Sequence, residues 1–196
     1  AFLFGGRRRT TVPLVNQAFD WEHGVFLGSI MASETTAAQQ GAVGNLRFDP
    51  MAMLPFCGYN MGDYFGHWLR MGHKLTQPPA IFHVNWFRQD ASGRFLWPGF
   101  GQNLRVLLWM IDRIQGRGQA VETPVGLLPT AGSLNLAGLD LPKADLDTLL
   151  SVDKEEWAAE VPEIRAFFGK FGSKLPRELD QSLEALARRV GAVASV

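Results

Sequence analysis

The sequence is poor in several features that mark particular classes of protein. It has one cysteine in 196 residues, so no disulfide can form within the chain. Its 19 basic and 19 acidic side chains cancel, whereas general nucleic-acid and membrane-surface binders carry a basic excess. No apolar run approaches the length of a membrane span. These absences argue against nucleic acids and membranes as partners and favour a cytoplasmic protein.

Motifs for catalysis and metal binding are also missing. The chain has no GxxxxGK[ST] phosphate loop and no recognisable set of nucleophile, base and acid. Asp20, Glu22 and His23 are metal-ligand types but match no standard spacing, so His23 is interpreted as a hydrogen-bonded turn residue. Cys57 lies among aromatic residues and is interpreted as an inert buried thiol. The chain is therefore expected to supply neither a catalytic nor a metal-binding residue.

The apolar content, 46% of the residues, is enough for one domain with a core. Strands are expected at residues 2–4, 12–19, 24–28, 45–49, 80–87 and 94–97, with 80–87 and 94–97 forming a hairpin, and residues 122–129 are expected to be extended or strand-like. Alternation places Ile81 and Phe82 on opposite faces of the 80–87 strand.

Helices are expected at 62–72, from 103 to about 116, and through most of 153–190. The helix from 103 has an apolar stripe of Leu104, Leu107, Leu108, Ile111 and Ile114. Asp153 and Glu156 resemble a capping box at the start of the tail, and the last helix has the stripe Leu179, Leu183, Leu186 and Val190.

The prediction is a mixed α/β fold, with a sheet core, packed helices and a helical C-terminal tail at residues 130–196 of the same domain. The strand at 2–4 is expected to be buried. Since termini usually lie at the surface, this indicates the C-terminal part of a longer protein.

Residues 86–105, WFRQDASGRFLWPGFGQNLR, concentrate aromatic side chains around a Pro-Gly pair and an asparagine. A flat aromatic ligand needs ring faces for stacking and a polar group that reads its edge. Phe87, Phe95 and Phe100 could provide the faces, and Asn103 the edge contact. Each phenylalanine could instead be ordinary core, and Asn103 could instead be the N-cap of the helix that follows. The clustering favours a purine site.

A second stretch, Gly5-Gly6 followed by three arginines, suits a phosphate. Glycines allow a tight turn and the close approach of a ligand, and the planar guanidinium binds phosphate oxygens in pairs. By itself this stretch is better explained as a solvated basic turn. Combined with the aromatic stretch, Arg7 or a neighbouring arginine would complete a purine-nucleotide site.

Residues 33–45 are small and polar, with little apolar surface to offset the entropy of ordering. Such a segment can be a lid that closes over a site or a plain surface loop. The residues alone favour the surface loop.

The chain resembles the C-terminal part of GTP-dependent phosphoenolpyruvate carboxykinases, most strongly the bacterial members. The resemblance covers almost the whole chain, and the motifs occur in family order. They are FGGRR (4–8), HGVFLGS (23–29), SETTAA (33–38), DPMAMLPFCGYNMGDYF (49–65), FHVNWFR (82–88), FLWPGFGQN (95–103) and ETPVG (122–126).

The resemblance implies roles for individual residues. Arg7 matches the arginine that contacts the nucleotide phosphates, and Asn103 matches the amide that helps to select guanine over adenine. Residues 33 to about 44 match the Ω-loop lid. The aromatics that enclose guanine are Phe87, Phe95 and Phe100, the GTP-binding turn adds Gly101 and Gln102, and the lid includes Ser33, Glu34, Thr35, Thr36, Ala37 and Ala38.

The resemblance also implies the reaction, in which oxaloacetate and GTP give phosphoenolpyruvate, GDP and carbon dioxide in gluconeogenesis. The chain would be part of a larger two-lobed, kinase-like fold, in which residues 1–129 are the guanine-nucleotide-binding and lid part of the C-terminal domain, and the full-length protein is expected to be a monomer. The family's phosphate loop and the ligands of its Mn²⁺ and Mg²⁺ ions would precede residue 1, so this chain alone should be inactive.

Two departures from the family pattern are visible. Gln102 stands where glutamate is usual, and the lid segment ends in Gly41-Ala42-Val43-Gly44 where a lysine-containing stretch is expected. A non-catalytic purine-nucleotide-binding module and a plain interaction domain whose aromatics are all core are the alternative functions.

Overall fold

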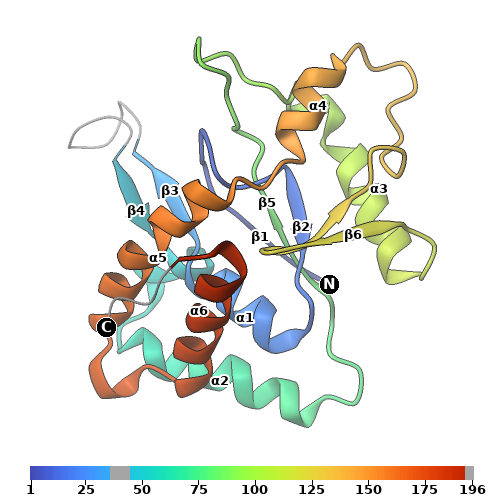
Figure 1. The fold of residues 1–196 in the computed structure, drawn as a ribbon. Coiled ribbons are helices and arrows are strands. Elements are labelled where there is room, and N and C mark those ends of the chain that lie inside the picture. The colour runs from blue at the N-terminus through green and yellow to red at the C-terminus, as the bar shows by residue number, and fades with distance from the viewer. Residues whose placement is uncertain (36–44, 193–196) are drawn as a thin grey trace.

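The computed structural model of the protein describes residues 1–35 and 45–192 (Figure 1). Its centre is a five-stranded sheet, in the spatial order β1 (Phe2–Gly5), β5 (Ile81–Val84), β2 (Val15–Gln17), β7 (Gly126–Pro129) and β6 (Ala120–Thr123). β1 runs parallel to β5, and every other neighbouring pair is antiparallel. β3 (Ala32–Glu34) and β4 (Leu46–Phe48) form a separate antiparallel pair. Together with the helices, this confirms the mixed α/β class.

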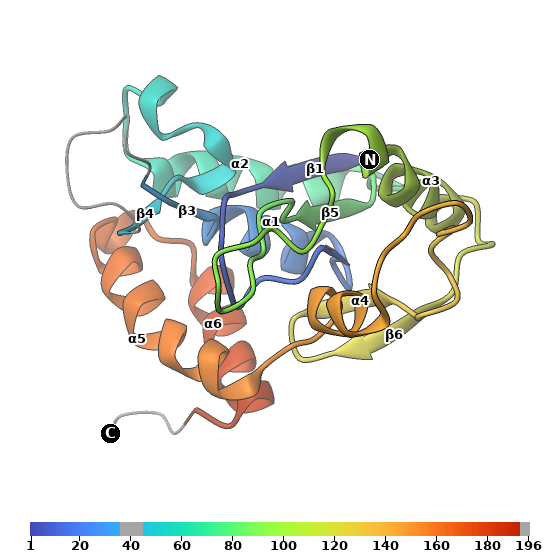
Figure 2. The same ribbon diagram turned by 90° about the horizontal axis from the view of Figure 1, so that it is seen from above.

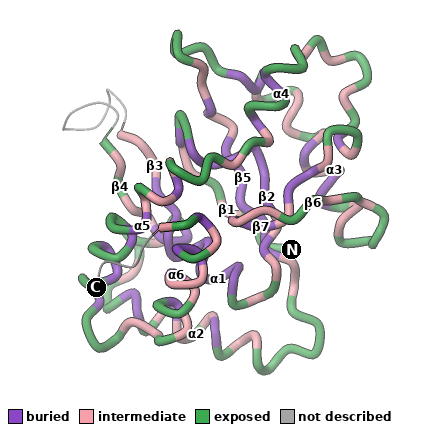
Figure 3. The backbone as a smooth tube through the Cα atoms, in the orientation of Figure 1, coloured by how far each residue is buried: buried purple, intermediate pink, exposed green. Residues whose placement is uncertain are grey.

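β5 is the most deeply buried strand, and its two faces contact different parts of the molecule (Figure 3). Ile81 packs with Leu27 on one face. Phe82 and Val84 belong to the core cluster of Trp97 on the other face. The alternation of side chains along a strand predicts this division.

Helices cover both faces of the sheet (Figures 1 and 2). One core cluster joins α1 (Trp21–Ser29), α2 (Met61–Lys74), α5 (Lys154–Gly169) and α6 (Arg177–Val190). The second cluster contains α3 (Asn103–Ile114) and α4 (Lys143–Leu149). Single 3₁₀ turns lie at Pro50–Ala52, Leu54–Phe56, Phe100–Gln102 and Gly172–Lys174. Within the described residues, no helix has the length and apolar content needed to cross a bilayer.

The helical tail follows its sequence pattern. The Asp153 carboxylate accepts hydrogen bonds from the backbone of Glu155 and Glu156, which caps α5 as predicted. α6 buries the predicted stripe of leucines, including Leu179 and Leu183. These helices pack in the same core as α1 and α2, while the boundary at residue 130 stays a prediction.

Residues 24–28 were predicted as a strand, and that prediction is wrong because they lie within α1. Asp20 caps this helix by accepting a hydrogen bond from the backbone of His23. The helix is buried on most sides, so its apolar run has no polar face to reveal a helical period. Gly24 permits close packing on β5, since a Cβ there would lie 2.4 Å from Ile81 Cδ1.

Three further expectations are corrected. β1 is an edge strand whose Phe2 and Leu3 are exposed, not a buried one. Residues 94–97 form no hairpin with β5, which pairs with β1 and β2; Phe95 makes only an isolated bridge to Gln89. Cys57 is only partly buried.

Candidate functional site

The aromatic stretch after β5 encloses an open hollow of about 340 Å³. Its walls are Trp86, Phe87, Phe95, Trp97, Pro98, Gly99, Phe100 and Asn103. The rings of Phe87 and Phe95 meet edge to face, with centroids 6.1 Å apart. Phe100 is 97% exposed. The hollow therefore presents apolar ring surface to solvent, which an ordinary core would bury.

A tight polar turn brings Phe95 back beside Phe87. The Asp90 carboxylate accepts hydrogen bonds from the backbone of Ser92 and Arg94. The hydrogen bond from the Ser92 hydroxyl is the main cause that lowers the pKa of Asp90. The returning chain is held where the Leu96 N–H donates to the Arg88 carbonyl, at 2.9 Å.

Asn103 begins α3, but it does not cap it. The N-cap position is Gln102, which makes no capping hydrogen bond with its side chain. The Asn103 Oδ1 accepts a hydrogen bond from Trp97 Nε1 at 2.8 Å instead. The alternative interpretation of Asn103 as an N-cap is therefore wrong, and its amide lines the aromatic hollow.

Two residues predicted for the site do not line the hollow. Gly101 and Gln102 lie in the 3₁₀ turn before α3. The Gln102 Oε1 accepts a hydrogen bond from Arg105 Nε at 2.6 Å, and Arg105 also donates to the Asn135 carbonyl. Gln102 thus holds the turn in place with its side chain.

The predicted apolar stripe of α3 is also turned outward. Val106, Trp109 and Met110 face the core, whereas the predicted stripe is mostly exposed, at Leu104, Leu108, Ile111 and Ile114. The predicted helix is confirmed, but the prediction of which face of α3 is buried is wrong.

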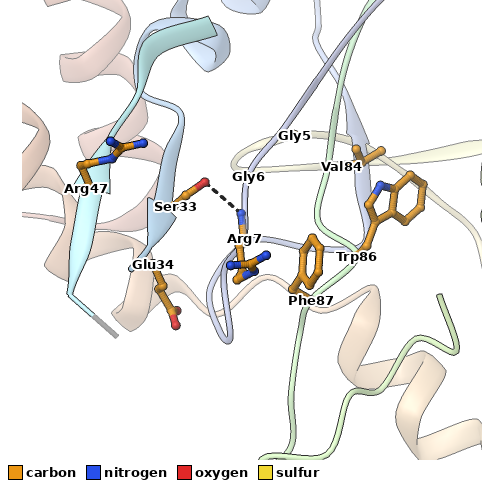
Figure 4. Close-up of a pocket in the computed structure, with 9 residues that line it drawn as sticks. All are labelled: Gly5, Gly6, Arg7, Ser33, Glu34, Arg47, Val84, Trp86 and Phe87. Carbon is orange, nitrogen blue, oxygen red and sulfur yellow. Dashed lines mark hydrogen bonds between the residues drawn. The ribbon is translucent and has the colours of Figure 1, made fainter. Parts of the chain in front are cut away.

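A second hollow of about 370 Å³, called the cationic hollow below because of its arginines, adjoins the first (Figure 4). It is lined by Gly5, Gly6, Arg7, Ser33, Glu34, Arg47, Val84, Trp86 and Phe87. Trp86 and Phe87 line both hollows. The Arg7 guanidinium lies over the Phe87 ring, 4.7 Å from its centroid, which is a cation–π distance. The two stretches identified in the sequence therefore meet at Phe87.

The three arginines after Gly6 have different surroundings. Arg8 is buried and pairs with Glu160 on α5. Arg9 pairs with Glu34, with Nε and Oε2 2.6 Å apart. Of the three, Arg7 lines the hollow, so the structure separates one candidate ligand contact from two structural ion pairs.

The glycine-arginine turn is attached to β3. The Arg7 N–H donates to Ser33 Oγ at 3.1 Å, drawn in Figure 4, and the Glu34 N–H donates to the Arg7 carbonyl at 2.8 Å. A Cβ on Gly6 would lie 2.5 Å from the Ala32 carbonyl oxygen, so this position requires glycine. Of the predicted lid residues, Ser33, Glu34 and Thr35 are described, whereas Thr36, Ala37 and Ala38 lie outside the described residues.

Asn85, which was not singled out from the sequence, connects the turn after Gly6 to the segment that carries Phe87. It is fully buried. Its Oδ1 accepts hydrogen bonds from the backbone N–H groups of Arg8 and Phe87, each at 3.2 Å. Its Nδ2 donates to the carbonyls of Arg8 and Val12, at 2.8 and 2.9 Å. The signal available in the sequence was a polar residue within the strong strand pattern at 80–87, because a polar group that such a strand buries requires hydrogen-bond partners.

The two buried histidines line neither hollow, and burial lowers the pKa of both. Burial, followed by the charge of Arg8, lowers the pKa of His83 to about 4. Burial, followed by the charge of Arg189, lowers the pKa of His23 to about 3. His23 lies in α1 and not in a turn, but it is hydrogen-bonded as expected, because its Nδ1 accepts from the Phe19 N–H at 3.1 Å.

Metal ligands do not gather in the described part of the chain. Across residues 1–35 and 45–192, no three His, Cys, Asp or Glu side chains are placed to hold an ion together. The described residues therefore do not fit the divalent metal ions that the resemblance implies.

Comparison with known proteins gives a consistent result. Residues 1–189 match the model of the phosphoenolpyruvate carboxykinase C-terminal P-loop domain. The chain is 58% identical over 195 residues to the phosphoenolpyruvate carboxykinase [GTP] of Neocallimastix frontalis, covering 98% of this chain and 32% of that protein. It is 52% identical to the protein of that name from Paenarthrobacter aurescens, over 97% of this chain and 32% of that protein, and 51% identical to that of Thermoplasma volcanium, with the same coverage. The chain thus spans about a third of the length of these curated relatives.

Proposed function

Because the chain belongs to the GTP-dependent phosphoenolpyruvate carboxykinase family and matches its C-terminal P-loop domain, we propose that it binds the guanine nucleotide of such an enzyme. The reaction of the whole protein would convert oxaloacetate and GTP into phosphoenolpyruvate, GDP and carbon dioxide. The observation that carries the proposal is the meeting of an aromatic hollow and a cationic hollow at Phe87.

In this proposal the base occupies the aromatic hollow. Phe87, Phe95 and Phe100 offer ring faces, and stacking on such rings contributes roughly 1–3 kcal/mol per base. The ring of Phe100 is exposed, so it can close on the base without leaving a core. Asn103 contacts the base edge, while Gly101 and Gln102 act through the shape of the turn that carries Phe100.

The phosphates extend into the cationic hollow. Arg7 presents its guanidinium over Phe87, and the planar fork can bind two phosphate oxygens at once. Arg47 lines the same hollow, and its charge is partly offset by Asp49, whose Oδ2 lies 3.4 Å from Arg47 Nη2. The pairing of Glu34 with Arg9 offsets the one carboxylate in this lining.

In this proposal the chain positions the nucleotide substrate and carries out no bond-making step. Correct positioning can lower a barrier substantially because it removes the entropy of bringing reactants together. The chain has no phosphate-loop motif, and the described residues bring no three His, Cys, Asp or Glu side chains together. Decarboxylation, phosphoryl transfer and the holding of Mn²⁺ and Mg²⁺ are therefore assigned to no residue here. The lid role of residues 33–44, a cytoplasmic location and a monomeric full-length enzyme stay predictions.

Nucleotide binding tests the proposal. GDP titrations are followed by tryptophan fluorescence, which can report binding because Trp86 and Trp97 line the aromatic hollow. With ADP as the comparison nucleotide, the protein should bind GDP in preference to ADP. Phe100→Ala and Asn103→Ala should weaken GDP binding. Phe56→Ala is the matched control, since Phe56 is also exposed, at 76%, and lies outside both hollows. A protein of the relatives' full length that binds neither nucleotide would contradict the proposal and favour a plain interaction domain. GDP binding without turnover in that protein would favour the non-catalytic module.

A further inference from the structure

We propose that Trp97 is a positioning residue that sets the base preference of the aromatic hollow by fixing the orientation of the Asn103 amide. The inference rests on the proposed function, because it takes the edge of the base to meet Asn103. It concerns a residue that makes no edge contact with the base itself and acts through a single hydrogen bond.

The chemistry of the indole determines which way the amide faces. A side-chain amide can turn by half a rotation and exchange its oxygen with its NH₂ group, whereas an indole N–H can only donate. Trp97 Nε1 lies 2.8 Å from the Asn103 Oδ1 atom. The amide oxygen must therefore face the indole, and the NH₂ group takes the other position.

Both partners are held by the fold. Trp97 is 1% exposed and packs in the core cluster of Val106 and Trp109. Asn103 is the first residue of α3 and so has a helical backbone. A polar group fixed by packing on one side and by secondary structure on the other is preorganised for recognition.

The fixed amide offers a donor to the base. Guanine carries an acceptor oxygen at its 6-position, whereas adenine carries an amino donor there. The Asn103 NH₂ group can donate to the guanine oxygen. Against adenine it would face another donor, and two buried donors left without acceptors are unfavourable.

Other groups around the hollow do not explain such a preference. Stacking on phenylalanine rings tolerates any base, because every base has an aromatic face. Gln102 is the neighbouring amide, but its oxygen is bonded to Arg105 and its side chain lies outside the lining of the hollow. Among the described lining side chains, Asn103 is the amide available for edge reading.

The primary test is Trp97→Phe in a protein of the relatives' full length that contains these 196 residues. Dissociation constants for GDP and ADP are measured by calorimetry, which does not depend on tryptophan emission. Phenylalanine keeps an aromatic ring but has no N–H, so the amide is free to turn. The ratio of ADP to GDP dissociation constants should fall about 2- to 12-fold, the effect of one net hydrogen bond.

Trp109→Phe is the matched control. Trp109 is also 1% exposed, belongs to the same core cluster and donates its Nε1–H to the Gln119 carbonyl at 3.0 Å. This variant loses the same ring volume and the same kind of hydrogen bond, but Trp109 does not line the hollow. Its base preference should match that of the unaltered protein, so a general loosening of the core is distinguished from a loss of amide orientation.

Two further variants connect the effect to Asn103. In an Asn103→Ala background, Trp97→Phe should not change the base ratio any further, because the group that it orients is absent. Asn103→Asp should shift the ratio toward ADP, since one carboxylate oxygen accepts from Trp97 and the other offers an acceptor to the adenine amino group. If Trp97→Phe does not fold, the base ratio of Asn103→Asp tests by itself whether the orientation of the Asn103 side chain sets the base preference.

Inosine diphosphate distinguishes recognition of the 6-oxygen of guanine from recognition of its 2-amino group. It keeps the 6-oxygen of guanine and lacks the 2-amino group, so Trp97→Phe should weaken its binding by the same factor as that of GDP. An unchanged GDP-to-ADP ratio in Trp97→Phe, or an undiminished GDP preference in Asn103→Asp, overturns the inference and leaves the proposed function intact. If the unaltered full-length protein does not prefer GDP, the proposed function fails together with the inference.

Discussion

Replacing Asn85 by alanine should lower the free energy of unfolding by about 3–5 kcal/mol. The Asn85 side chain makes four hydrogen bonds, all to backbone groups of Arg8, Val12 and Phe87. Each buried group that loses its partner costs roughly 1–3 kcal/mol, although water can reach some of them. The free energy of unfolding of a typical domain is about 5–15 kcal/mol, so this one substitution removes a large fraction of the stability.

Asn16→Ala is the matched control for this measurement. Asn16 lies in β2 of the central sheet and is 2% exposed, so it is a buried asparagine like Asn85. Its side chain makes one hydrogen bond, from Nδ2 to the Val125 carbonyl at 2.9 Å, and its Oδ1 has no protein partner. We expect a loss of about 1 kcal/mol for Asn16→Ala. Both values come from urea denaturation, with the slope checked for constancy.

The Asn85→Ala variant should also weaken nucleotide binding. Asn85 connects the turn that carries Arg7 with the segment that carries Phe87, so its loss lets the two hollows move apart. GDP affinity should fall in Asn85→Ala and stay unchanged in Asn16→Ala, when both are measured well below their unfolding temperatures. Equal loss of stability in the two variants would refute the hydrogen-bond argument, and equal GDP affinity would refute the view that Asn85 holds the two parts of the site together.

Phe100→Ala should leave the unfolding free energy within about 0.5 kcal/mol, because the ring is 97% exposed. It should weaken GDP binding about 5- to 150-fold, the equivalent of roughly 1–3 kcal/mol of stacking; a stability loss without a binding loss would contradict this. Gly6→Ala places a Cβ 2.5 Å from the Ala32 carbonyl oxygen and should cost about 1–3 kcal/mol, seen as a lower melting temperature. Burial lowers the pKa of His83 from 6.5 to about 4, so below pH 6.5 the unfolded chain takes up a proton that the folded chain does not. Stability should therefore fall by about 3 kcal/mol between pH 6.5 and pH 4 on account of His83, and His83→Gln should show a correspondingly shallower pH dependence in urea denaturation.

Several features could be predicted from the sequence because they depend on neighbouring residues. The alternation in residues 80–87 placed Ile81 and Phe82 on opposite faces of a strand, as observed. The leucine stripe of the last helix identified its buried face. The clustering of three phenylalanines within a short stretch indicated the aromatic hollow, because a short stretch that turns back on itself keeps its side chains together.

Other features required the tertiary structure, because they depend on what packs against an element. The helix at residues 24–28 was missed because surrounding elements bury most of its sides. The apolar stripe of α3 gave the right period but the wrong face, since the core contacts Val106 and Trp109 instead. A sequence pattern defines which residues share a face, and only the packing partners decide which face is buried.

The candidate site shows the same division. The amino-acid sequence by itself determined its chemistry: arginine after two glycines, rings around Pro-Gly, and an amide at the start of a helix. Only the fold brought Arg7 to within 4.7 Å of the Phe87 ring, through hydrogen bonds of Asn85 that join segments 77 residues apart. Only the fold turned the Asn103 amide oxygen toward Trp97. Such contacts depend on the simultaneous placement of distant segments, for which no local pattern of residues carries a signal.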